Sequence, residues 1–432
     1  MIPGSLRRLT ALRRAPFQGL LSPLAIMDFR LLLSSSFIWW AARFMEFVLV
    51  GWLVLELTNS PWQVAVMGFY RSIPFLFVGF VSGPIIDNLG RRKVILLAQL
   101  TNVVITVLLA LLLWVNRLEL WHLAVGSLLM GTAWSLDWPA RRSFVPDLVG
   151  RGKTVDALLL ENFSQNIARI TGPFFGGVLF DALGAPGAFT GLAILSGLTL
   201  LILLGLSNQP VPRKTKAAQS SPLGNIVDGL RYVRHSQPIL GSLLITVVMN
   251  FLVFPYVAML PIFARDVLGQ EATGLGGLGA AAGIGAFAGL FIINRIRNFV
   301  SPGWIFAVGS AFQAIMVLLF AFSAHYGLST SLLFFSGIGQ VCFGIMQSSI
   351  ILLAASDEMR SRAMGTLVLA IGAGPVGQLQ IGALAEEFGA PLAVQLHATV
   401  AVLAIIVVMT ALPGMRQRIE ESDNEPAPAP AD

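Results

Sequence analysis

Three charged side chains lie in sequence runs that are otherwise apolar. Arg43 and Glu46 are three residues apart, a spacing that places both on one face of a helix. Arg71 lies in the next apolar run, at nearly the same depth as Glu46. Charges inside a membrane are costly unless they are paired or used, so they mark candidate sites. We expect Glu46 to exchange a proton or bind a cation and the arginines to bind an anionic group; the alternative is a static network that fixes helix packing.

Further polar residues in apolar runs are candidates for the same site. Arg169 is another intramembrane cation, and the excess of arginines over Glu46 suits an anionic or zwitterionic substrate. Asn166, Asn250 and Gln347 are candidates to line a cavity. For Asn250 and Gln347 the sequence favours a hydrogen bond between helices over a contact with a ligand.

Motifs of several enzyme classes are absent from the sequence. There is no Gly-rich loop ending in Lys-Ser or Lys-Thr, so ATP-driven activity is not expected. The four histidines are scattered and Cys342 is the only cysteine, so no metal site is predicted. No Gly-x-Ser-x-Gly nucleophile motif occurs. We therefore predict a protein that is not an enzyme and has no cofactor.

The composition is that of a polytopic membrane protein. Only 12% of the 432 residues are charged and 56% are hydrophobic, against about 25% charged in soluble domains. We predict an all-α membrane protein with twelve transmembrane helices, each about 20 residues long. The expected helices span 31–57, 62–85, 94–115, 120–140, 157–180, 187–207, 239–264, 273–293, 303–323, 328–353, 364–385 and 391–412.

The distribution of Lys and Arg predicts the topology. With both termini in the cytoplasm, 23 of the 28 basic residues lie on the inner side, two lie outside and three lie within spans. This asymmetry explains the basic pI without a nucleic-acid partner. The expected parts are a cytoplasmic tail (1–30), a six-helix bundle (31–207), a cytoplasmic connection (208–238), a second six-helix bundle (239–412) and a disordered cytoplasmic tail (413–432).

An internal repeat supports two bundles of six helices. Gly172-Pro173 is matched by Gly374-Pro375, and Gly184-Ala185-Pro186 by Gly389-Ala390-Pro391. Parallel repeats of this kind are typical of secondary transporters with a site between the halves. Within the fifth span, the helix-packing motif consists of Gly172, Pro173, Gly176 and Gly177, whose small residues allow close approach of a neighbouring helix.

The loop after the second span resembles a family signature. The segment from Gly83 to Lys93 contains Asp87, Gly90, Arg91 and Arg92. It is similar to the G-x-x-x-D-x-x-G-R-[RK] motif of the major facilitator superfamily. The loop after the fourth span, with Asp137, Arg141 and Arg142, resembles the drug-efflux and enterobactin-exporter branch. By this resemblance these residues form a cytoplasmic gate, in which Asp87 pairs with Arg141 or Arg142.

The resemblance implies proton-coupled efflux of a small amphipathic molecule by alternating access. The expected partners are a small-molecule substrate and the lipid bilayer of the bacterial inner membrane, with no nucleic acid and with the chain acting as a monomer. Two alternatives stay open: an importer or lipid or metabolite transporter of the same fold, and a non-transporting scaffold or receptor. The charges within the membrane argue against the scaffold, since a scaffold has no need for them.

Overall fold

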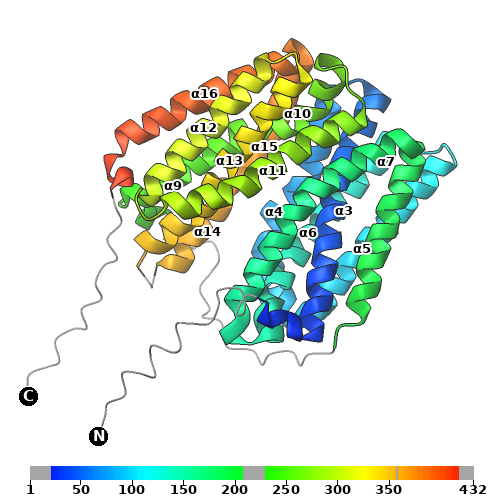
Figure 1. Cartoon of the computed structure of the whole chain (residues 1–432), viewed down its shortest axis with the longest axis horizontal. Coiled ribbons are helices and arrows are strands. Elements are labelled where there is room, and N and C mark those ends of the chain that lie inside the picture. The colour runs from blue at the N-terminus through cyan, green and yellow to red at the C-terminus, as the bar shows by residue number, and fades with distance from the viewer. Residues whose placement is uncertain (1–20, 208–228, 357–358, 418–432) are drawn as a thin grey trace, which may run out of the picture.

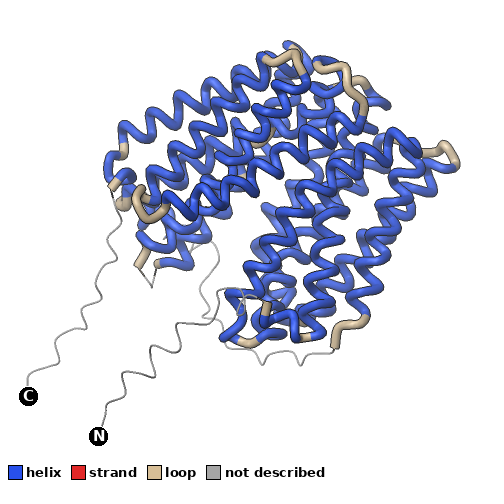
Figure 2. Tube along the Cα trace, in the orientation of Figure 1, coloured by secondary structure: helices blue, strands red, loops and turns tan. Residues whose placement is uncertain are grey.

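The computed structural model describes residues 21–207, 229–356 and 359–417. All regular elements in these ranges are helices joined by short loops (Figure 2). Most of the two predicted tails and of the central connection lies outside the described residues. The segment 413–432 was expected to be disordered, but Pro413–Arg416 forms a short 3-10 helix with Met415 buried.

The first half of the chain forms five long helices after a short 3-10 turn at Ser22–Ala25. They are α3 (Met27–Thr58), α4 (Pro61–Leu89), α5 (Arg91–Trp114), α6 (Leu120–Val149) and α7 (Thr154–Leu204). Gly90 separates α4 from α5 with a φ of 86°, a backbone conformation that favours glycine. Helix α7 is 51 residues long because it continues through Gly184, where φ is 67° and ψ is 179°. This non-helical residue divides α7 into two arms.

The second half contains shorter and more interrupted helices. They are α9 (Gln237–Val248), α10 (Tyr256–Ile262), α11 (Ala272–Ile296), α12 (Pro302–Phe322), α13 (Tyr326–Ala354), α14 (Arg360–Ile371), α15 (Ala373–Phe388) and α16 (Ala390–Ala411). Two π-helical segments, Met249–Val253 and Phe263–Val267, flank α10. The span expected over 239–264 is therefore a broken one. Pro255 and Pro261 supply a reason, since neither can donate a backbone hydrogen bond.

The helices are consistent with the predicted twelve spans. Among the described residues, nine helices are long and apolar enough to cross a membrane, and ten are if the bent α4 counts as one. The 51 residues of α7 hold two predicted spans, one on each side of Gly184. Helix α6, with 30 residues, corresponds to the remaining one.

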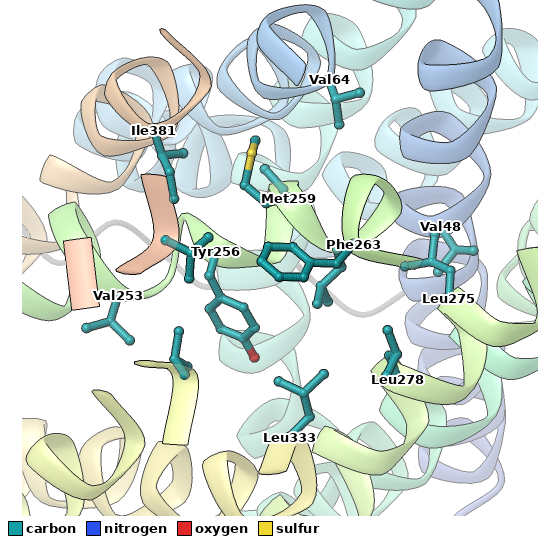
Figure 3. Packing of buried hydrophobic residues seen from close by; sticks show 14 of the residues in the cluster. Val48, Val64, Val253, Tyr256, Met259, Phe263, Leu275, Leu278, Leu333 and Ile381 are labelled. Carbon is teal, nitrogen blue, oxygen red and sulfur yellow. The ribbon is translucent and has the colours of Figure 1, made fainter. Parts of the chain in front are cut away.

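The helices lie in two groups that follow the halves of the chain (Figure 1). The groups meet at the end of the molecule that carries residues 59–62 and 268–272, which we call the distal end. They diverge toward the opposite end, which carries residues 21 and 417 and which we call the terminal end (Figure 1). A continuous apolar core joins the groups. In it Val48 and Val64 of the first half pack with Met259, Phe263 and Leu275 of the second (Figure 3).

Two seams carry the contact between the groups. In the first seam α7 crosses α11, and Gly177 packs against the backbone of Ala272. In the second seam α15 crosses α4, and Gly382 packs against Trp62 and Ala65. Neither glycine has room for a Cβ atom. Small residues thus allow each pair of helices to approach closely.

The seams define the register of the repeat. Gly177 and Gly382 are 205 residues apart, as are Gly184 and Gly389, which both have positive φ. In this register Gly172 is equivalent to Gly377 and not to Gly374, so the predicted match of the Gly-Pro pairs is wrong by three residues. The packing agrees with this correction. A Cβ at Gly172 would overlap the carbonyl oxygen of Ala41, and one at Gly377 would overlap that of Phe251.

Candidate transport site

An ion pair joins α3 to α4 inside the first group. Glu46 Oε2 lies 2.9 Å from Arg71 Nη2, and the two residues are 2% and 9% exposed. The same nitrogen of Arg71 donates to the carbonyl oxygen of Arg43 at 2.9 Å. Glu46 Oε1 is buried and has no hydrogen-bond partner among the described residues. The pair is therefore incomplete on the acid's side, which leaves one oxygen available to a proton or a ligand.

Arg43 belongs to the same cluster but does not form an ion pair with Glu46. Its guanidinium lies over the ring of Trp134, 4.0 Å from the ring centroid. This arrangement is a cation–π contact, which stabilises an arginine by about 0.5–2 kcal/mol depending on its burial. Of the two arginines predicted to flank Glu46, the structure pairs only Arg71 with it.

Glu46 lies between two hollows. One, of about 320 Å³, lies within the first group and is also lined by Arg43, Asn102 and Trp134. The other, of about 350 Å³, lies between the groups and is lined by Arg71 together with Ala258 and Pro261 of the second half. A carboxyl group at this place contacts both the interior of one half and the boundary with the other. A change in its charge therefore acts on both.

The remaining predicted cavity residues do not join this cluster. Asn166 donates to the carbonyl oxygen of Asn162 within its own helix, at 2.8 Å. Arg169 reaches across the boundary between the groups, where Nη1 donates to Gln340 Oε1 at 3.3 Å. In the second half, Gln347 Nε2 donates to Thr246 Oγ1 at 3.0 Å.

Asn250 makes a comparable local contact, because its Nδ2 donates to the carbonyl oxygen of Thr246 at 2.9 Å. Gln347 of α13 thus makes a hydrogen bond between helices, to Thr246 of α9, whereas Asn250 bonds to the backbone four residues earlier in the chain and not to another helix. No such contact links either residue to Glu46 in the described part of the chain.

The residues predicted as a gate separate into two ion pairs near the terminal end. Asp137 is fully buried and accepts from Arg141 Nε at 2.8 Å, and also from Gln99. Arg141 Nη1 donates to Ser35 at 3.0 Å. The predicted pairing of Asp87 with Arg141 is thus wrong: Arg141 bonds to Asp137, which lies one turn earlier on α6.

The second pair lies closer to the surface. Arg91 pairs with Asp147 and donates from Nε to Ser143 Oγ at 3.2 Å, so it ties the start of α5 to the end of α6. Asp87 is exposed on the last turns of α4, and so is Gly83. Arg92 donates to the carbonyl oxygen of Leu204 at 3.3 Å.

Arg142 is exposed and lies over the ring of Trp138, 5.9 Å from its centroid. The Gly-Pro motif packs α7 on both sides. Gly172 and Gly176 lie against α3, and the carbonyl oxygen of Pro173 lies against Gly276 of α11. The four-residue motif thus holds α7 to its own group and to the other at once.

Three residues that contact the candidate site were not predicted as members of it. Asn102 lines the hollow beside Glu46, Gln99 bonds to Asp137, and Asp147 is the partner of Arg91. A signal was present for two of them, because Gln99 and Asn102 are three residues apart in an otherwise apolar span and so share a helix face. Asp147 lies in the loop after the fourth span that carries the family resemblance, but nothing in that loop indicated Arg91 as its partner.

Comparison with known proteins places the chain in a family of transporters. A family model described as "Transmembrane secretion effector" matches residues 18–431. The multidrug efflux pump Tap of Mycolicibacterium fortuitum is 26% identical over 85% of this chain and 91% of that protein. The staphyloferrin A transporter of Staphylococcus aureus is 21% identical over 82% and 89%. The enterobactin exporter EntS of Shigella flexneri is 25% identical over 75% and 78%.

Solved structures share the fold at low identity. A nucleoside transporter, NupG, superposes with a TM-score of 0.71 at 14% identity, covering 89% of this chain and 98% of that one. A bacterial homologue of the human lysosomal transporter Spinster gives a TM-score of 0.65 at 14% identity, covering 90% and 96%. The chain is a multi-pass membrane transporter that belongs to the transmembrane secretion effector family, in the drug- and siderophore-efflux branch of the major facilitator superfamily.

Proposed function

We propose that this transporter exports a small amphipathic molecule across the bacterial inner membrane in exchange for protons. Both termini and the central connection face the cytoplasm in this proposal. The names of the relatives support export, since they include a multidrug efflux pump and an enterobactin exporter. The split of basic residues between the two sides supports the orientation.

Glu46 is the proposed proton carrier, and its geometry is the observation that carries the proposal. One of its oxygens is paired with Arg71 and the other is buried without a partner among the described residues. Protonation of the carboxyl group would remove its charge and weaken the tie between α3 and α4. Because Glu46 also lines the hollow between the groups, this change biases the equilibrium between their two arrangements.

A transport assay in inverted membrane vesicles tests the coupling. Ethidium, norfloxacin and enterobactin are the probes, and uptake is measured with and without an imposed pH gradient. We expect the gradient to drive uptake of at least one probe in the wild type, and Glu46→Gln to abolish the dependence on the gradient. Glu387→Gln is the matched control, because Glu387 is exposed at the end of α15.

Two outcomes would overturn the proposal. If Glu46→Gln leaves gradient-driven uptake unchanged, Glu46 is not the proton carrier. If no probe responds to the gradient in the wild type, proton antiport of these molecules is wrong. Uptake into right-side-out vesicles in place of inverted ones would indicate import.

A further inference from the structure

Charged side chains of alternating sign follow one another through the first group of helices. Arg71 and Glu46 form the ion pair described above, and Arg43 lies within electrostatic reach of both Glu46 and Asp137. Asp137 in turn pairs with Arg141. Cations and acids thus alternate from the boundary between the groups toward the terminal end. Neighbours of opposite sign offset part of the cost of burying each charge.

Hydrogen bonds extend this row from Asp137 to Glu161 on α7. Arg141 donates from Nε to Asp137 and from Nη1 to Ser36 Oγ, at 2.8 and 3.2 Å. The Ser36 hydroxyl donates to Glu161 Oε1 at 3.3 Å, and Glu161 also interacts with the charges of Arg141 and Arg142. Glu161 lies about two turns from the start of α7, whereas Asp137 lies about three turns from the end of α6. Glu161 is therefore the acid nearest the terminal end in this row, which we call the charge row.

Two small hollows adjoin the charge row. The hollow beside Glu46 is also lined by Asn102, and we call it the Asn102 hollow. The other lies nearer the terminal end, is partly open and is lined by Ser36 and Glu161; we call it the Ser36 hollow. Each has room for about one or two water molecules, and Trp39 lines both. Water in the two hollows can therefore bridge acids of the row that are not bonded to each other.

No direct hydrogen bond joins Glu46 to Asp137, so water is needed between them. Glu46 Oε1 has no partner among the described residues, and Glu46 shares the Asn102 hollow with Asn102. Asn102 lies about one turn after Gln99, which donates to Asp137. Helix α5 thus presents polar groups from this hollow to Asp137. A water molecule in the Asn102 hollow completes the path between the two acids.

The hollow on the other side of Glu46 has a different lining. Between the groups, Glu46 and Arg71 are surrounded mainly by apolar side chains, which are Phe47, Val50, Val64, Met67, Ala258 and Pro261. Glu46 itself is buried, so bulk water does not reach it directly. The polar way out from Glu46 thus leads through the first group toward the terminal end.

We propose that Glu46 releases its proton toward the terminal end along the charge row, and that Glu161 is the acid that passes this proton to solvent. The Glu46 carboxyl group gives its proton to water in the Asn102 hollow, and this water gives one to the Asp137 carboxylate. Asp137 passes a proton to Glu161 through water and the Ser36 hydroxyl.

The passage leaves only Glu46 changed. Asp137 and Glu161 each gain one proton and lose one, whereas Glu46 becomes the carboxylate that pairs with Arg71. The proposal rests on the proposed function, because it takes Glu46 as the proton carrier, and it adds the route and the exit acid. Release at the terminal end is what export in exchange for protons requires when both termini face the cytoplasm.

A pH jump followed by infrared spectroscopy tests the route without any transported molecule. The full-length protein in lipid nanodiscs is moved rapidly from acidic to alkaline buffer. Proton loss from Glu46 is followed by the carboxylic-acid band that Glu46→Gln removes. We expect Glu161→Gln to slow this loss by about tenfold or more, because the exit acid is missing. Glu161→Asp keeps a carboxyl group and should restore most of the rate. Asp156→Asn is the matched control, since Asp156 lies on α7 and lines neither hollow.

A second pair of variants tests the water beside Glu46. Asn102→Leu replaces a polar wall of the Asn102 hollow with an apolar side chain and should slow proton loss from Glu46 by about tenfold as well. Thr106→Val is its control, because Thr106 is buried on the same helix and does not line the hollow. Thermal unfolding of each variant verifies that it is folded.

The outcomes separate the route from the proposed function. Proton loss from Glu46 at the wild-type rate in both Glu161→Gln and Asn102→Leu would overturn the route, even where Glu46→Gln abolishes gradient-driven transport. Equal slowing by Asp156→Asn would also overturn it, since any acid on α7 would then serve. A failure of Glu46→Gln to alter transport would overturn the proposed coupling, whereas the infrared rates would still show whether the proton of Glu46 leaves by way of Glu161. If the wild type has no band that Glu46→Gln removes, both proposals are wrong.

Discussion

The first seam, α7 against α11, and the second seam, α15 against α4, each have an acidic side chain at the N-terminus of the opposing helix. Asp181 accepts from the amides of Ala272 and Thr273, at 3.1 and 2.7 Å. Glu386, which lies 205 residues later, accepts from the Trp62 amide at 3.1 Å and from the Ser60 hydroxyl at 2.8 Å. The two seams differ at the first residue of the opposing helix. Helix α11 begins with Ala272, whose amide donates to Asp181, whereas α4 begins with Pro61, which has no N–H.

The two halves differ more in the charge of their interior residues than in the contacts that close their seams. Gly131 packs against the carbonyl oxygen of Arg71, and Gly337 packs against that of Ala282, so these two contacts are equivalent. In this register the charged Arg71 corresponds to Ala282. Arg141, ten residues after Gly131, likewise corresponds to Gln347, ten residues after Gly337.

Glu46, the third charged residue to be compared, also corresponds to a neutral residue of the second half. The contacts of Gly172 with Ala41 and of Gly377 with Phe251 place Glu46 opposite Tyr256. Glu46, Arg71 and Arg141 thus each correspond to a neutral residue of the other half. The repeat has kept the contacts that close the seams, whereas the Asp, Glu, Lys and Arg side chains that are buried among the described residues, Glu46, Arg71, Asp137 and Arg141, all belong to the first half. The proposed proton carrier therefore lies in the half that holds the buried charge, and the other half lines the hollow beside it with the neutral residues Ala258 and Pro261.

The largest expected effect comes from breaking the buried charge of the first half. Asp137→Asn removes the carboxylate that pairs with the buried Arg141 guanidinium, and breaking a buried ion pair costs about 3–5 kcal/mol. We expect this variant to unfold at a clearly lower temperature in detergent. Asp147→Asn removes a partly exposed pair with Arg91 and should cost about 0–1 kcal/mol. Equal destabilisation by the two variants would contradict the assignment of buried charge to the Asp137 pair.

The next effect tests whether the two seams are functionally equivalent. Asp181→Ala and Glu386→Ala each remove a carboxylate from a helix N-terminus, and loss of such a cap costs about 1–2 kcal/mol. We expect the modified seam to open more often, since about 1.4 kcal/mol is a factor of ten in an equilibrium.

Thiol labelling measures this opening in a Cys342→Ser background. Leu275→Cys reports on the first seam and Val64→Cys on the second, because both positions are buried. Each reporter should be labelled about five to thirty times faster when the acid of its own seam is removed. Glu387→Ala should change neither rate. If Asp181→Ala accelerates neither reporter, the carboxylate does not hold the first seam.

Prediction from the sequence succeeded where a local pattern sets the structure. The span positions follow from apolar runs, and the family from the loop at Asp87, since both are written in consecutive residues. The partner of Arg141 could not be read in this way. Asp137 and Asp87 were both candidate partners of Arg141 in the sequence. Only the packing of α6 against α3 and α5 shows that Asp137 is buried beside Arg141, whereas Asp87 is exposed. The register of the repeat failed for a similar reason, because a Gly-Pro pair recurs at Gly374 whereas the close contact is made by Gly377.

The smallest expected effect comes from making the second seam a copy of the first. Pro61→Ala supplies the missing N–H, which can donate to Glu386 as the Ala272 amide donates to Asp181. The new bond is opposed by the loss of the rigid proline, which contributes about 0.4–1 kcal/mol. We expect a net stabilisation of the seam and labelling of Val64→Cys that is slower by a factor of about two to three. In a Glu386→Ala background only the loss of proline remains, so Pro61→Ala should then accelerate labelling. The same response in both backgrounds would show that the amide and the carboxylate do not interact, and that the seams resemble each other in sequence position without sharing the bond that closes them.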